Sequence, residues 1–338
     1  MNQINQINHT AQAMRDTHSV SSGSKNTYHD GQPIFIAGMP RSGTTWVAKI
    51  FDSHPDTYYL HEPDISLRPH NLPEWPSPQP EDDILDATSR YLRALETTIT
   101  ARSTNKMPVF RKFYNTPLDA TRRKFKLLFG RPVPPPVRRP HQDVRLVMKS
   151  VSNFNRLSLF AAAEPGTRFV ALVRHPLDQI SSMMRGLRMG RFGDTQIEFS
   201  WLLRCPWAKD IGLDETTLAE ASESEKHAWL WALLTHPIGE PDAHNIKLVS
   251  YESICAHPME LFDELFYYVN LELHKNTAAA IRATSGATND GRYFSINRVS
   301  KDEIGKWQTI MPRDEQKKLW DIVSRSNIMD KLPTLVAP

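Results

Sequence analysis

The stretch Gly38-Met39-Pro40-Arg41-Ser42-Gly43-Thr44-Thr45-Trp46 joins two apolar segments of different periodicity. Residues 33–37 before it are a short run of strand formers, and the apolar residues after it recur at helical spacing. A strand, a glycine-bounded loop and a helix form a phosphate cradle, because small residues let the backbone curl and its N–H groups converge on an anion. The helix adds its unpaired N–H groups and the positive end of its dipole. This stretch therefore predicts an anion-binding loop at the end of a buried strand.

The two glycines of this loop keep the spacing of the nucleotide P-loop, G-x-x-x-x-G, but Thr44 stands where that motif has its lysine. An enzyme that uses nucleoside triphosphates needs this lysine on the β- and γ-phosphates and a hydroxyl group on magnesium. Here the cation comes earlier, at Arg41, and the loop ends in two threonines. A P-loop kinase or nucleotide hydrolase is therefore the less favoured alternative, which magnesium-dependent ATP turnover would support.

The rest of the sequence describes a globular protein of 338 residues, with 40% apolar and 23% charged residues. No run is long enough to span a bilayer, and residues 1–30 are polar without the apolar core of a signal peptide. We therefore expect a disordered tail over residues 1–30, a single domain over residues 31–338 and a cytoplasmic location. Cys205 and Cys255 cannot form a disulfide framework, and no Cys/His cluster has zinc spacing, so no metal site is expected.

A basic, proline-rich insert occupies about residues 101–142. Residues 101–145 hold twelve Lys/Arg against two Asp, which gives this segment a charge of +10 in a chain whose net charge is +3. Such a segment is either a solvated face or an attractor of anionic substrates, nucleic acids or membrane surfaces. It lacks the interleaved aromatic residues of known nucleic-acid readers. A nucleic-acid-binding module therefore stays an alternative, and no nucleic-acid partner is expected.

Four more short apolar runs predict strands, at residues 57–60, 145–150, 168–173 and 245–250. Helical patterns are found at residues 81–100, 154–163, 176–184, 218–234, 258–269 and 313–326, with a basic helix at 117–129 inside the insert. Strands that alternate with helices are typical of a parallel sheet. The expected fold is α/β, a P-loop-type parallel β-sheet flanked by helices on both faces.

Polar residues stand where several of these strands end. Glu62 follows the second strand, Lys149 and Ser150 end the third, and Arg174 follows the fourth. The carboxyl ends of parallel strands meet at one edge of the sheet, which is where ligands bind in such folds. These groups and the loop from Arg41 to Thr45 are therefore expected to form one site.

In this context the wording Pro-Arg-Ser-Gly-Thr-Thr-Trp at residues 40–46 resembles the 5′-phosphosulfate loop of sulfotransferases that use 3′-phosphoadenosine 5′-phosphosulfate (PAPS). Residues 174–182 resemble the 3′-phosphate motif of that family, R-x-P-x₅-S, and residues 249–258 resemble its stretch near the adenine. The Gly-Lys-Trp at residues 305–307 resembles a C-terminal element of the family. The Tyr-Leu-His-Glu-Pro at residues 59–63 is most similar to the carbohydrate branch.

This resemblance implies an enzyme that moves a sulfuryl group from PAPS to an acceptor hydroxyl by in-line displacement, with PAPS as co-substrate and no metal required. The residues implied to bind the 5′-phosphosulfate are Arg41, Ser42, Gly43, Thr44, Thr45 and Trp46. Arg174 would pair with the 3′-phosphate and Ser182 would add a hydroxyl donor. Tyr251 would line the adenine pocket, and Lys306 would be a further contact with the donor.

Sulfuryl transfer needs a general base for the acceptor hydroxyl and positive charge on the leaving phosphate. We assign Glu62 as the base and Lys149, with Arg41, as the stabilising cations. His61 is the rival for the role of base, and in an extended strand only one of two neighbours should face the cofactor. Cytosolic small-molecule sulfotransferases carry a histidine two residues after the strand-end lysine. That position is Val151 here, which favours a glutamate base.

The acceptor is predicted to be a carbohydrate hydroxyl, with a tyrosyl, phenolic or small-alcohol acceptor as the alternative. Residues 64–145 and 186–216 are expected to build its pocket, and the basic insert would suit an anionic acceptor. Trp201 and Trp207 could stack on sugar rings, although burial in the core is the commoner outcome for tryptophan.

Overall fold

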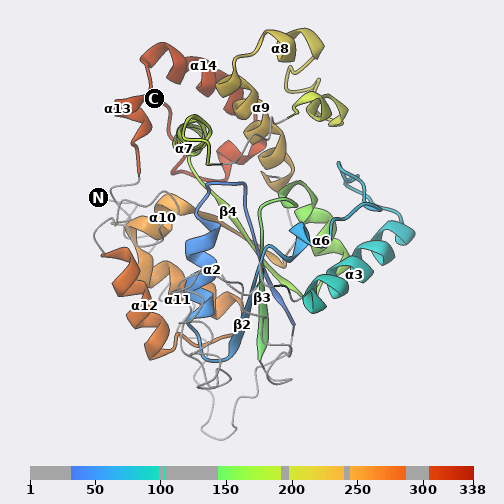
Figure 1. Ribbon diagram of the computed structural model, residues 1–338, viewed down its shortest axis with the longest axis vertical. Helices are drawn as coiled ribbons and strands as arrows, with labels where there is room; N and C mark the ends of the chain where they lie inside the picture. The colour runs from blue at the N-terminus through green and yellow to red at the C-terminus, as the bar shows by residue number, and fades with distance from the viewer. Residues whose placement is uncertain are drawn as a thin grey trace, which may run out of the picture.

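The computed structural model describes residues 32–98, 144–191, 198–239, 244–286 and 304–338, together with Thr100 and Ser103 (Figure 1). A five-stranded sheet lies at its centre, with every pairing parallel and the strand order β2-β3-β1-β4-β5. The strands are β1 (Ile34–Ala37), β2 (Thr57–His61), β3 (Arg145–Ser150), β4 (Arg168–Val173) and β5 (Ile246–Ser250). The α/β fold with a parallel sheet is therefore confirmed, and β1, which leads into the glycine-bounded loop, is the central strand.

Helices cover both faces of the sheet, because alternate residues of each buried strand enter different cores. Ile34 and Ile36 belong to one apolar cluster, whereas Phe35 and Ala37 belong to the other. The first face packs on α2 (Thr44–Asp52), α10 (Tyr251–Ala256), α11 (Pro258–Tyr268) and α12 (Lys275–Ser285). The second packs on α3 (Asp82–Thr97), α6 (Leu157–Ala163), α7 (Pro176–Arg188), α9 (Glu223–Thr235) and α14 (Arg313–Val323).

The structure corrects several predicted helix boundaries. The single helix expected over residues 218–234 is wrong, because α8 (Glu215–Glu220) ends before extended residues Ala221 and Ser222, and α9 begins after them. The sequence reasoning did not anticipate α10, α12 or the short α13 (Trp307–Ile310). The described 3-10 turns are η1 (Pro63–Ile65), η2 (Phe154–Arg156), η3 (Ser200–Arg204), η4 (His236–Gly239) and η6 (Asn327–Asp330). The tail over residues 1–30 and the helix expected at 117–129 lie outside the described residues.

The C-terminal segment packs on the start of α7, near the carboxyl ends of the strands (Figure 1). Asp178 accepts hydrogen bonds from the backbone N–H groups of Gly305, at 2.7 Å, and Trp307, at 3.2 Å. The His175 ring stacks on the rings of Trp307 and Trp320, with centroid distances of 5.0 and 5.8 Å. Residues 304–338 are therefore held on the element that directly follows Arg174.

Within the described parts of the chain, no helix is both long and apolar enough to cross a membrane.

A capping box starts α9, which packs on α7. The Ser222 hydroxyl accepts the N–H of Glu225, and the Glu225 carboxylate accepts the N–H of Ser222 at 2.8 Å. Hydrogen bonds from Ser222 lower the pKa of the Glu225 carboxyl. The backbone N–H groups of Ser222 and Glu225 thereby each have an acceptor.

Ser222→Ala is expected to lower the free energy of unfolding by about 1 kcal/mol, because an N-cap acceptor is lost. Urea denaturation followed by circular dichroism measures this change. Ser324→Ala is the matched control: this exposed hydroxyl follows α14 and caps no N-terminus, so a change below about 0.5 kcal/mol is expected. An equal effect of the two substitutions would contradict the capping role.

Candidate active site

Residues from all five strand ends meet at one edge of the sheet. The loop after β1 carries Arg41, Glu62 follows β2, Lys149 belongs to the end of β3, and Arg174 and Tyr251 follow β4 and β5. This placement is a consequence of parallel pairing, because it directs every carboxyl end the same way. The predicted convergence of the loop, Glu62, Lys149 and Arg174 is therefore present, and β5 adds Tyr251.

The loop before α2 leaves a group of backbone N–H donors without acceptors. The N–H groups of Gly43, Thr44 and Thr45 have no hydrogen-bond partner among the described residues, whereas those of Trp46 and Val47 bond to the Gly43 carbonyl. The Ser42 hydroxyl is fully buried and also has no partner there. Adjacent donors at the start of a nine-residue helix are the donor set that a phosphate or sulfate group requires.

Glycine is required at position 43 for two independent reasons. Its φ of 96° lies in the left-handed region, which side-chain-bearing residues rarely adopt. A Cβ atom there would also lie 2.4 Å from the Tyr251 ring. The aromatic ring therefore packs directly on the loop backbone and joins the end of β5 to the end of β1.

Two arginines and a serine surround the loop. The Arg41 Nε donates to the Ser182 hydroxyl at 3.1 Å, and an Nη of Arg174 donates to the Arg41 carbonyl at 3.2 Å. The Arg174 guanidinium also lies 4.9 Å from the centroid of the Tyr251 ring, within cation–π range. Arg41, Arg174, Ser182 and Tyr251 thus share one site, although α7 and α10 bring them from distant parts of the sequence.

Trp46 contacts this group, and Lys306 belongs to the C-terminal segment that packs on α7. Trp46 packs edge-on against Tyr251 at 6.2 Å and donates its indole N–H to Thr284 at 3.0 Å. Lys306 is partly buried and stands between Gly305 and Trp307, the two residues whose N–H groups Asp178 accepts.

A second group lies at the ends of β2 and β3. The Glu62 carboxylate forms an ion pair with the Lys149 ammonium, and the same oxygen, Oε1, lies 3.7 Å from Nε2 of His61. The His61 Nδ1 is 2.6 Å from the Tyr59 hydroxyl. Lys149 is 2% exposed, so this pair is screened from bulk water.

The structure changes the premise of the expectation that only one of His61 and Glu62 faces the site. That expectation assumed an extended strand, but β2 ends at His61 and Glu62 has the left-handed backbone, with φ of 48°. The Glu62 N–H still donates to the Lys149 carbonyl at 2.8 Å, and the positive φ then turns the chain. Both side chains therefore lie beside each other instead of on opposite faces.

Several supporting residues were missed by sequence reasoning. Asp64 accepts from Ser150 at 2.6 Å and from Asn153 at 2.9 Å, and burial raises the pKa of the Asp64 carboxyl. Gln179 donates to the Pro40 carbonyl at 3.0 Å and so ties α7 to the loop. Gln179 lies within the quoted motif at 174–182, but only the fold shows that its amide reaches a loop 139 residues away.

The two tryptophans considered for sugar stacking pack on Trp75. The Trp75 and Trp201 rings stack at 5.0 Å, and Trp207 meets Trp75 edge-on at 5.5 Å. Their contacts join the two regions expected to build the acceptor pocket, residues 64–145 and 186–216. Packing therefore accounts for these three rings.

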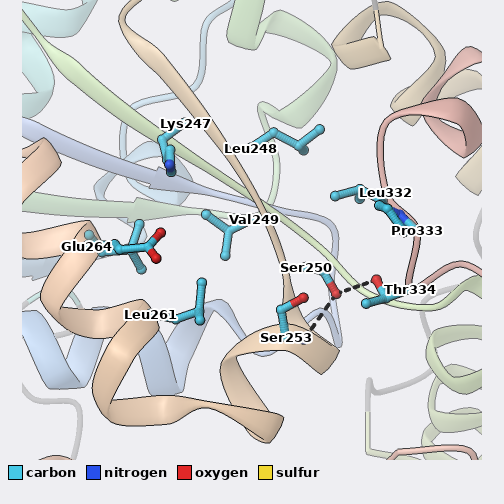
Figure 2. A pocket seen from close by; sticks show the side chains of 11 residues that line it. Lys247, Leu248, Val249, Ser250, Ser253, Leu261, Glu264, Leu332, Pro333 and Thr334 are labelled. Atoms are coloured by element: carbon cyan, nitrogen blue, oxygen red, sulfur yellow. Dashed lines mark hydrogen bonds between the residues drawn. The ribbon is translucent and has the colours of Figure 1, made fainter. Parts of the chain in front are cut away.

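A cavity of about 170 Å³ lies beside the site and contains none of its predicted residues. Figure 2 shows it between β5, α11 and the C-terminal segment, where the Thr334 hydroxyl donates to Ser250 at 2.7 Å. Leu248, Val249 and Leu332 contribute apolar surface to it. In the described part of the chain, no three His, Cys, Asp or Glu side chains are grouped to hold a metal.

The sequence matches the model described as the Sulfotransferase family over residues 33–275. No curated protein matches it. Among solved structures, the sulfotransferase domain from the curacin biosynthetic pathway is 15% identical; the match covers 87% of this chain and 97% of that chain, with a TM-score of 0.44. The sulfotransferase domain from the Synechococcus PCC 7002 olefin synthase gives 17% identity, 90% and 98% coverage and a TM-score of 0.42. Mouse sulfotransferase SULT7A1 complexed with PAP is 13% identical; the match covers 89% of this chain and 84% of that chain, with a TM-score of 0.42.

Likenesses to solved structures at these identities and TM-scores are remote. The family match, in contrast, covers most of the chain, from β1 to the start of α12. It includes the loop with its unpaired N–H groups, the Glu62–Lys149 pair, Arg174 and Tyr251. On this match, the chain belongs to the Sulfotransferase family.

Proposed function

We propose that this sulfotransferase moves a sulfuryl group from PAPS to an acceptor hydroxyl, with Glu62 as general base. One observation carries the proposal: the unpaired N–H groups of the loop and the Glu62–Lys149 pair lie at the same edge of one sheet. An anion cradle next to a carboxylate and a cation supplies the parts of an in-line transfer, which are positioning, charge stabilisation and proton removal.

The 5′ end of the donor would bind to the loop. The N–H groups of Gly43, Thr44 and Thr45 and the Ser42 hydroxyl offer donors to the phosphosulfate oxygens. The fully buried and unpartnered hydroxyl supports this assignment, because such a group is costly unless a ligand or water completes it. Arg41 and Trp46 would complete the 5′ site.

The 3′ end would bind on the other side of Tyr251. Arg174 and Ser182 offer a guanidinium and a hydroxyl to the 3′-phosphate, a dianion that suits a bidentate arginine. The Tyr251 ring, already in contact with the Arg174 guanidinium, offers a face to the adenine. Lys306 is a further cation for this end, carried by the segment that Asp178 anchors.

The reaction would proceed beside the Lys149–Glu62 ion pair. Glu62 takes the proton of the acceptor hydroxyl while the oxygen of that hydroxyl forms the new bond to sulfur and the bond to the 5′-phosphate oxygen breaks. Lys149 and Arg41 stabilise the charge that develops on the leaving phosphate.

For the acceptor we favour a carbohydrate hydroxyl, on the similarity of residues 59–63 to the carbohydrate branch; a phenolic or small alcohol is the alternative. A labelled-sulfate transfer screen with PAPS against glycans, phenols and tyrosine peptides identifies the class, and ATP with magnesium in parallel tests the kinase alternative.

Arg174→Ala is expected to weaken binding of adenosine 3′,5′-bisphosphate by at least about tenfold, because a charged hydrogen bond worth roughly 1.5–3 kcal/mol is lost. Isothermal titration measures the affinity, and adenosine 5′-phosphate, which lacks the 3′-phosphate, should bind both proteins equally. Arg188→Ala, at the exposed end of the same helix, is the control and should bind like the wild type. Absence of binding to the wild-type protein would remove PAPS as the donor.

Gly43→Ala is expected to reduce donor binding by at least about tenfold, because the new methyl group displaces the Tyr251 ring and strains the loop. The matched control is Gly190→Ala, since Gly190 also has a positive φ, of 61°, but a Cβ atom there would meet nothing within 4 Å. In both variants, alanine must adopt the left-handed backbone conformation, which is unfavourable for a residue with a side chain. Only the first should change the titration with adenosine 3′,5′-bisphosphate, and equal losses would refute the contact as the cause.

Glu62→Gln is expected to lower kcat by about a hundredfold or more, which is the usual contribution of a general base. Its affinity for adenosine 3′,5′-bisphosphate should stay within about twofold, because Glu62 is placed on the acceptor side. Single-turnover transfer of labelled sulfate measures the chemical step. Glu74→Gln, which removes an exposed ion pair with Arg204, is the control. Unchanged turnover in the Glu62 variant would exclude it as the base.

A further inference from the structure

His61 lies inside a chain of polar groups that runs along β2 toward Glu62. Tyr59 and His61 are two positions apart and therefore project from the same face of the strand, toward α2. The Tyr59 hydroxyl lies 2.6 Å from Nδ1 of His61, and Nε2 of the same ring lies 3.7 Å from Oε1 of Glu62. The ring thus connects a phenol on one side to the proposed base on the other.

The direction of the first hydrogen bond follows from the surroundings of Tyr59. Burial, with smaller contributions from the charges of Asp52 and Glu62, raises the pKa of Tyr59 well above its ordinary value, so the phenol keeps its proton. Among the described residues, the partner of this hydroxyl is Nδ1 of His61. If Nδ1 carried a hydrogen and donated to the phenol, the buried phenolic proton would lose its acceptor, which is costly. The phenol therefore donates and Nδ1 accepts.

A neutral imidazole carries one proton, so acceptance at Nδ1 places it on Nε2. This is the nitrogen that faces the Glu62 carboxylate. An N–H directed at a carboxylate favours the ionised form of the carboxylate. A separation of 3.7 Å is longer than a hydrogen bond, and such contacts in ligand-free enzymes tighten when substrate binds.

We propose that Tyr59 sets the tautomer of His61, and that His61 is a positioning residue that holds the Glu62 carboxylate ionised and oriented, not the general base. This inference rests on the proposed function, in which Glu62 takes the acceptor proton. During transfer the proton moves from the acceptor oxygen to Glu62, the oxygen–sulfur bond to the acceptor forms and the sulfur–oxygen bond to the donor phosphate breaks. His61 keeps its own proton throughout.

The charged groups around Glu62 determine the sign of the expected pH effect. Lys149 on β3 and the Nε2–H of His61 favour the ionised carboxylate. Asp64 in η1 is the opposing group, since its charge and that of Glu62 each disfavour the other. Removal of the His61 N–H leaves Lys149 alone to counter the effect of the Asp64 charge on Glu62. Glu62 should then be protonated at higher pH, and the acidic limb of the pH–rate profile should move to higher pH.

The tautomer can be read directly in the ligand-free protein. Nitrogen-15 spectra of histidine-labelled protein distinguish a protonated from an unprotonated ring nitrogen, and we expect the Nε2–H form for His61. Tyr59→Phe removes the donor to Nδ1 and should produce a mixture of tautomers. Tyr58→Phe is the matched control, because Tyr58 belongs to the apolar cluster on the opposite face of β2 and should leave the His61 signals unchanged. A wild-type protein with Nδ1 protonated would overturn the proposal.

Two substitutions of His61 separate its donor role from a role as base. The amide nitrogen of His61→Gln can replace the Nε2–H toward Glu62, whereas that of His61→Asn is too short to do so. We expect His61→Gln to keep kcat within about threefold of wild type, and His61→Asn to lose about tenfold or more with its acidic limb at higher pH. The affinity of both variants for adenosine 3′,5′-bisphosphate should be unchanged, and this unchanged affinity shows that both variants are folded.

The outcomes distinguish this inference from the proposed function. If His61→Gln were as inactive as Glu62→Gln, His61 would be the base and the inference would be wrong. If both His61 variants kept the wild-type pH profile, His61 would have only a structural role, which also overturns it. If Glu62→Gln kept full activity, the failure would lie in the assignment of Glu62 and thus in the proposed function.

Discussion

The contact between Gly43 and the Tyr251 ring is the constraint on which the site depends. Gly43 has a left-handed backbone and α2 begins without a side-chain cap, and the N–H groups of Gly43, Thr44 and Thr45 have no partner among the described residues. The Tyr251 ring occupies the space that a Cβ would take and also carries the Arg174 guanidinium. A single aromatic ring therefore contacts both the loop backbone and the second cation. The parallel sheet makes this contact possible, since it brings the ends of β1, β4 and β5 side by side.

The site divides into two regions with different electrostatics. Around the loop, the Arg41 side chain donates to Ser182, and the Arg174 side chain donates to the Arg41 carbonyl. Two guanidinium groups beside a loop with unpaired N–H donors favour the approach of an anion. Around β2 and β3 the charges are instead compensated within the protein, because Lys149 pairs with Glu62. The first region is suited to hold a ligand, and the second to move a proton beside it.

The order of the elements, the parallel sheet and the loop were predictable because each follows from local pattern. Apolar runs of strand length alternated with helical periods, and glycine spacing marked the turn between β1 and α2. The convergence of Glu62, Lys149 and Arg174 followed from the parallel topology, which predicts no interatomic distances. The break between α8 and α9 was missed although Ser222 and Glu225 carry a capping signal at that point. The short helices α10 and α13 were missed because they are held by tertiary contacts, which local propensity does not reveal.

The sequence by itself determined the α/β class, the phosphate-cradle loop and the set of polar residues at the strand ends, because these depend on neighbours along the chain. The tertiary structure alone decided which way the side chains at the end of β2 turn. Alternation along a strand predicted that His61 and Glu62 would separate, but Glu62 leaves the strand with a positive φ and bonds to the Lys149 carbonyl. A positive φ at a residue other than glycine is uncommon, so the alternation rule for strands could not have placed the two side chains beside each other.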